Sequence, residues 1–148
     1  AFMGCENYTI DDMRVNPGLG IALPEKSGFA KKIIDDYNDS SFYKKDGSLN
    51  FYTVVQRTTD FLTKYGLKNS LNTQTVDNIM IYPAQYFSPK DLRDGRLKLT
   101  DYTHSIHHYS ASWFTKKTAI YSATLRFLYR IFGEKGFAFL RKLFGKNK

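Results

Sequence analysis

All three histidines of the chain fall within five positions, at His104, His107 and His108. Neutral imidazole is a good ligand for Mn²⁺ or Zn²⁺, and protonated imidazole pairs with phosphate. In an extended segment successive side chains point to opposite faces, so only one of His107 and His108 would face an open site. The alternative is two satisfied polar residues at a strand edge, because a histidine pair without further ligands at metal-binding spacing is a weak signal.

Helices and short strands are expected to alternate ahead of these histidines. Ser27 is a candidate N-cap for a helix over about 28–38, and a second helix is predicted over 51–65, closed by Gly66. The glycines and proline of 16–20 predict a turn. Short strands are predicted at 21–23, 78–82, 97–100 and 105–109. This alternation favours an α/β body.

The composition is that of one globular domain with a real core. The chain has 148 residues, of which 42% are hydrophobic and 24% charged. The single cysteine, Cys5, excludes a disulfide framework and a cysteine-based zinc site, and we expect it in the core. No apolar run is long enough to span a bilayer, and the first residues do not have the pattern of a secretory signal.

The net charge of +8 is confined to the C-terminal segment. Residues 116–148 hold nine lysines and arginines against one acidic residue, whereas residues 1–115 are neutral overall. Apolar residues in this segment predict two amphipathic helices, over 117–132 and 137–144, which fit interfacial membrane binding. The charges expected to meet anionic lipid are Arg126, Arg130, Arg141 and Lys142.

Two alternatives bear on this basic tail. It could instead be a helical hairpin folded onto the body with a solvated basic face. Nucleic acid is not an expected partner, because the aromatic residues of the tail share stripes with leucine and isoleucine, as buried residues do.

Several motifs, taken in order, resemble one enzyme family. They are residues 81–89 (IYPAQYFSP), 94–97 (DGRL) and 103–113 (THSIHHYSASW), preceded by 16–22 (NPGLGIA) and 46–49 (DGSL). Together they resemble the C-terminal part of the DXD-containing, Och1-like glycosyltransferases of bacterial capsule and lipopolysaccharide gene sets. The resemblance covers about residues 1–115, and linked motifs in a consistent order are more specific than any one of them.

The resemblance implies a retaining transferase of the Rossmann-like GT-A type, with a nucleotide-sugar donor and a glycan or glycolipid acceptor. A divalent metal, Mn or Mg, would bridge the donor diphosphate. His107 is the first choice for a metal ligand and His108 the second. The diphosphate would be bound by Tyr109, Ser112 and Trp113.

The resemblance also gives Asn16 a role in binding the sugar or acceptor. The alternative is that Asn16 shapes the Pro-Gly turn that follows it.

One departure from the family pattern is serious, because the sequence contains no Asp-X-Asp. We therefore expect residues 1–115 to be the C-terminal part of a catalytic domain whose metal motif lies upstream, inactive alone, with residues 116–148 as its tail. The expected location is the cytoplasm, peripheral on the inner face of the cell membrane, and a homo-oligomer is a further expectation. The competing hypothesis is a non-catalytic α/β module anchored by its tail to membrane or polyanion.

Overall fold

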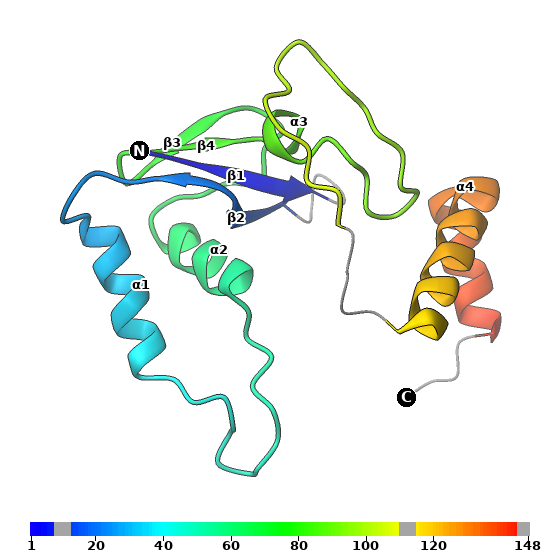
Figure 1. Ribbon diagram of the computed structural model, residues 1–148, viewed down its shortest axis with the longest axis horizontal. Coiled ribbons are helices and arrows are strands. Elements are labelled where there is room, and N and C mark those ends of the chain that lie inside the picture. Colours follow the sequence, from blue (N-terminus) through cyan, green and yellow to red (C-terminus); the bar gives the residue numbers. More distant parts are fainter. Residues whose placement is uncertain (8–12, 110–114, 145–148) are drawn as a thin grey trace. The chain divides into compact units, whose positions relative to one another are not determined.

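The computed structural model describes residues 1–7, 13–109 and 115–144. The described residues have a mixed α/β fold with four strands and four helices, which confirms the predicted fold class at this level (Figure 1). Two compact units are present, one made of Ala1–Pro89 with Leu99–His107 and the other of Lys90–Lys98 with His108–Lys148. The elements are β1 (Phe2–Asn7), β2 (Met13–Ala22), α1 (Gly28–Asn38), α2 (Val54–Lys64), β3 (Gln74–Val76), β4 (Ile79–Tyr82), α3 (Ala84–Phe87) and α4 (Lys116–Phe144).

The first unit is built on a mixed sheet with strand order β2-β1-β4-β3. Strand β1 pairs antiparallel with β2 and parallel with β4, while β3 and β4 form an antiparallel hairpin. The two residues of the hairpin turn, Asp77 and Asn78, both have positive φ, which matches the backbone of the tight turns that suit twisted strands. The predicted strand at 78–82 is confirmed as β4.

One face of this sheet carries the hydrophobic core. Met3 and Cys5 of β1 are fully buried on that face with Leu62 of α2, and Phe29 of α1 joins the same cluster. Helix α2 packs on β2, and its Thr59 hydroxyl accepts the backbone N–H of Val15 at 2.9 Å. This bond gives a partner to a backbone donor of an edge strand that would otherwise face water.

The segment predicted as a turn, 16–20, does not separate two elements, because it lies within the ten-residue strand β2. The strand predicted at 21–23 is the end of β2 at Ile21 and Ala22, and Leu23 lies outside it. The pairing jumps from Met3 opposite Ile21 to Gly4 opposite Asn16, so residues 17–20 form a bulge within the ladder. Pro17 lacks a backbone N–H and is tolerated at such a bulge on an edge strand.

The two predicted helices are present. Ser27 caps α1 as expected, with its side chain accepting the N–H of Ala30. Helix α2 begins three residues later than predicted, because Thr53 and Gln56 form a capping box in which each side chain accepts the other residue's backbone N–H. Gly66 follows α2 with a φ of 98°, as the predicted helix end requires.

The predicted strands at 97–100 and 105–109 are absent from the described structure. Leu97 makes only an isolated antiparallel bridge with Lys90, and residues 103–109 have no strand partner. Tyr109 has a φ of 51°, which lies in the left-handed region, so the alternation expected to place it on the same face as His107 is interrupted.

In the second unit, α4 is two helical segments joined at Gly133, whose φ of 62° and ψ of −173° are not helical. The chain turns back there, so that the two segments of α4 lie side by side (Figure 1). The ring of Phe137 meets that of Tyr129 with centroids 5.5 Å apart. Two helical segments meeting at Gly133 confirm the sequence prediction for this region.

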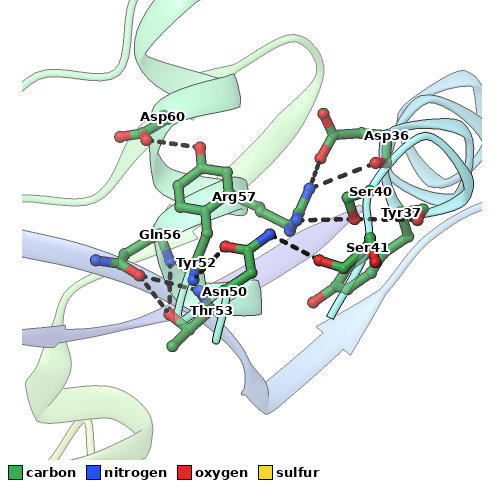
Figure 2. Close-up of polar contacts among 10 residues, drawn as sticks. All are labelled: Asp36, Tyr37, Ser40, Ser41, Asn50, Tyr52, Thr53, Gln56, Arg57 and Asp60. Carbon is green, nitrogen blue, oxygen red and sulfur yellow. Dashed lines mark hydrogen bonds and ion pairs between the residues drawn. The ribbon is translucent and has the colours of Figure 1, made fainter. Parts of the chain in front are cut away.

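A polar clamp centred on Arg57 holds the loop between α1 and α2. Figure 2 shows the guanidinium of Arg57 paired with Asp36 and directed at Ser40. Arg57 is only 6% exposed, and it donates to Ser40 Oγ at 2.9 Å. Its centre lies 4.6 Å from the ring of Tyr37 and 4.7 Å from that of Tyr52.

The same clamp includes a tyrosine–carboxylate contact. The hydroxyl of Tyr52 donates a hydrogen bond to Asp60 at 2.7 Å. Partial burial of the hydroxyl, and to a smaller extent this bond, raises the pKa of Tyr52 to about 12. The clamp thus joins both helices to the loop by charge-assisted bonds and cation–π contacts.

Replacing Arg57 with Ala should lower the free energy of unfolding by about 2–4 kcal/mol, because it removes two cation–π contacts and charged hydrogen bonds. The matched control is Lys31→Ala, which removes an exposed ion pair with Asp35 and should change stability by less than about 0.5 kcal/mol. Urea unfolding followed by circular dichroism measures both. Equal effects would mean that the clamp is no stronger than a surface pair.

Candidate functional site

The sheet face opposite the hydrophobic core is the candidate functional site. Along β1 the side chains alternate, so Phe2, Gly4 and Glu6 face away from Met3 and Cys5. Gly4 lies directly opposite Asn16 of β2 on one side and Tyr82 of β4 on the other. The register therefore brings an amide and a phenol to the two sides of a glycine.

The glycine allows helix α3 to lie close to the sheet. A Cβ on Gly4 would come within 2.9 Å of Cδ2 of Phe87 and 3.3 Å of Cβ of Leu19. The ring of Phe87 also stacks on that of Phe2, with centroids 5.7 Å apart. Any side chain at position 4 would push α3 and the residues that follow it off this face.

Aromatic rings continue from Phe87 into an aromatic cluster within the first unit. Tyr86 stacks on Tyr102 with centroids 5.6 Å apart, and the ring of His104 lies 6.0 Å from Tyr86 and 6.1 Å from Phe87. The backbone N–H of His104 donates to the carbonyl of Tyr86 at 2.8 Å. The members of the aromatic cluster are Phe2, Tyr82, Tyr86, Phe87, Tyr102 and His104.

A polar pair lies beside Gly4 on the same face. Glu6 is only 8% exposed, and its Oε2 accepts a hydrogen bond from Nδ2 of Asn16 at 2.8 Å. The other end of that amide, Oδ1, accepts the backbone N–H of Gly18 at 2.8 Å. Asn16 therefore shapes the bulge that follows it, as the alternative reading proposed, and its role in sugar binding stays a prediction.

The residues predicted to bind metal and diphosphate fall at the end of the segment 103–109 and beyond it. His107 and His108 are exposed, and Tyr109 is half-buried. Ser112 and Trp113 lie outside the described residues. Across 1–7, 13–109 and 115–144, no three or more His, Cys, Asp or Glu side chains are grouped to hold a metal ion.

Cys5 is a core residue, as predicted. It is fully buried, and that burial, with a smaller contribution from Glu6, raises the pKa of its thiol to about 12. Because the thiolate is the reactive form, this thiol is not a nucleophile at neutral pH.

Sequence reasoning missed Glu6 and the aromatic cluster. The sequence gives only a weak indication of Glu6. A carboxylate within an otherwise apolar strand is expected to have a hydrogen-bonding partner or a function. The sequence pattern places Tyr82 and Tyr86 in a motif but does not show which residues they contact. The contact between His104 and Tyr86 joins residues 18 apart and depends on the loop between them.

The aromatic cluster and the Glu6–Asn16 pair together give this face of the sheet both apolar and hydrogen-bonding groups. Aromatic rings provide apolar surfaces, while tyrosine hydroxyls, a carboxylate and an amide provide hydrogen-bonding atoms. That combination fits a polyhydroxylated ligand better than a purely apolar one, because such a ligand has both apolar and hydroxyl-bearing faces.

Comparison of the chain with protein-family models, curated protein sequences and solved structures gave no match.

Gly4→Ala should lower the free energy of unfolding by about 1–3 kcal/mol, because the added methyl overpacks the contact with Phe87. The ring resonances of Phe87 and His104 should shift with it in NMR spectra. Gly28→Ala is a matched control, since a Cβ there meets nothing within 4 Å. An unchanged stability for Gly4→Ala would show that α3 adjusts freely on the sheet.

The raised pKa of Cys5 predicts that the folded chain resists thiol labelling at pH 8, where the thiol stays protonated. In urea the pKa returns to its ordinary range near 8.5 and labelling should become rapid. Absorbance of the leaving group of a disulfide reagent gives both rates. Rapid labelling without denaturant would mean that β1 is exposed.

Proposed function

We propose that the chain is the C-terminal part of a retaining, metal-dependent glycosyltransferase of the GT-A type. It would transfer a hexose or related sugar from a nucleotide-sugar donor to a growing surface polysaccharide or lipopolysaccharide. The observation that supports this proposal is the meeting of separate family-like motifs on one face of the sheet.

Three segments contribute to that meeting. Asn16 comes from the 16–22 motif, and Tyr82 comes from the 81–89 motif on the other side of Gly4. The 103–113 motif enters through its first residues, since the hydroxyl of Thr103 donates to the carbonyl of Gln85 at 2.9 Å and His104 bonds to Tyr86. Motifs distant in sequence are expected to converge in this way when they serve a common ligand.

The residues of this face have distinct expected roles. The aromatic cluster would stack on sugar rings, and the Glu6–Asn16 pair would bond to their hydroxyls. A divalent cation, Mn²⁺ or Mg²⁺, would neutralise charge on the departing nucleoside diphosphate. His107 is the preferred ligand from this chain and His108 the second, with the carboxylate ligands supplied by an Asp-X-Asp outside it.

The proposed place of action is the cytoplasmic face of the cell membrane, where a lipid-linked acceptor would be reached. Within the described part of the chain, no helix has the length and apolar character needed to cross a bilayer. We expect attachment to the membrane surface through the basic segment 116–148.

The deciding experiment measures nucleotide-sugar hydrolysis by the full-length gene product, with a panel of donors and with or without Mn²⁺. Metal-dependent release of one nucleoside diphosphate would support the transferase and identify its donor. Absence of release from a folded protein that contains an Asp-X-Asp would contradict the proposal and favour a non-catalytic module.

In that full-length enzyme, His107→Ala should lower metal-dependent turnover by at least about tenfold, while His108→Ala should do less. Thermal unfolding should be nearly unchanged for both, because both side chains are exposed. The titration of activity with Mn²⁺ provides the measurement. Equal losses of stability in the two variants would return the histidines to a structural role.

A further inference from the structure

One side of the first helical segment of α4 is in contact with residues 93–95 of the same unit. Arg130 donates from Nε to the backbone carbonyl of Asp94, and Gly95 approaches the side chains of Arg126 and Arg130. Arg93 lies over the ring of Tyr129, with its guanidinium carbon 5.5 Å from the ring centroid. The segment 90–98, which we call the strap, therefore lies along the side of α4 that carries these residues.

The strap is itself held by charge. Arg93 pairs with Asp91 at 2.9 Å and lies 3.7 Å from Glu134, the only acidic residue of 116–148. Hydrogen bonding to Asp91 raises the pKa of Arg93 further above its already high value, and the contacts with Arg93 lower the pKa of Asp91 despite its burial. The strap and the helix thus form a connected polar network on one side.

The opposite face of the same helical segment is apolar and open. Phe127 and Ile131 follow Ile120 by seven and eleven residues, so the three share one face of the helix. Their exposed fractions are 68% for Ile120, 61% for Phe127 and 57% for Ile131. Tyr129 follows Ile120 by nine residues, about two and a half turns, which places Tyr129 on the far side of the helix. Arg126 and Arg130 lie on the flank between Tyr129 and the apolar face, so the strap covers the far side and that flank.

Positive charge borders this apolar face. Lys116 lies one turn before Ile120 and Lys117 beside it, and both are exposed. Because Glu134 is engaged by Arg93, no acidic side chain of the described helix offsets these lysines. An apolar stripe that begins at two lysines is complementary to a surface with anionic groups outside and hydrocarbon beneath.

We propose that this face of α4, formed by Ile120, Phe127 and Ile131 with Lys116 and Lys117 at its start, binds the surface of an anionic lipid membrane. The apolar side chains enter the region between headgroups and acyl chains, and the lysines meet lipid phosphates. The strap holds the other face and orients the helix. Arg126 and Arg130, expected above to bind lipid, make their described contacts with the strap, so the proposal assigns them a positioning role.

Other occupants fit the charges less well. A second copy of this chain would bring another segment of net charge +8 against the first, which is repulsive. A nucleic acid would satisfy the lysines but would leave three large apolar side chains in water. The proposal rests on the peripheral location suggested above and on none of the transferase chemistry.

The test is cosedimentation of the full 148-residue chain with phosphatidylcholine vesicles, with and without phosphatidylglycerol. The chain should bind only the vesicles that contain phosphatidylglycerol. The variant Phe127→Ser with Ile131→Ser should weaken binding by at least about tenfold, because it removes apolar side chains that enter the interface. Both residues are exposed, so circular dichroism should show unchanged folding.

The matched control is Arg126→Gln with Arg130→Gln, which changes the same number of side chains where the helix contacts the strap. This control should reduce vesicle binding by less than about threefold. The variant Lys116→Gln with Lys117→Gln should instead remove most of the salt dependence of vesicle binding. Equal loss in the arginine and apolar variants, or binding to phosphatidylcholine alone, would overturn the proposal.

Light scattering provides a second discriminating measurement. If Phe127 and Ile131 mediated self-association, the apolar variant would convert a dimer to a monomer, and the membrane assignment would be wrong. Donor hydrolysis by the full-length enzyme with a soluble acceptor should survive the apolar variant, so loss of vesicle binding and loss of transferase activity are distinguishable.

Discussion

The first unit depends on the alternation of side chains along β1. This strand is hydrogen-bonded on both sides, to β2 and β4, and its two faces meet different environments. Met3 and Cys5 complete the hydrophobic core, while Gly4 and Glu6 form the floor of the candidate site. A shift of one residue in register would exchange the two faces and place a carboxylate in the core.

Local features of the fold could be predicted, because they depend on residues close in sequence. The cap at Ser27 and the helix end at Gly66 are examples, as is the break at Gly133. The bulge in β2 could not be predicted, since only the pairing of β1 with two separate stretches of β2 reveals it. Proline and glycine at 16–20 indicate an interruption, yet a turn and a bulge have the same local composition.

The candidate site was predictable in its segments but not in its contacts. The motifs identify Asn16 and the histidines as candidate site residues. The hydrogen bond between Asn16 and Glu6, however, depends on strand register, which the motifs do not give. The alternation rule failed for 105–109 because it assumes a strand, and the backbone of Tyr109 is left-handed. The basic segment is visible in the charge count, but only the contacts of the strap show that Arg126 and Arg130 lie against residues 94 and 95.

The break at Gly133 also determines the length of α4 and the arrangement of its two helical segments. A continuous α-helix of 29 residues would be about 43 Å long and would present its apolar side chains as a narrow line. The reversal at Gly133 shortens that length and places two helical rows next to each other, joined by the Tyr129–Phe137 contact. The second unit therefore presents two short helical segments side by side in place of one long helix. This arrangement depends on Gly133, because glycine adopts a positive φ without steric cost.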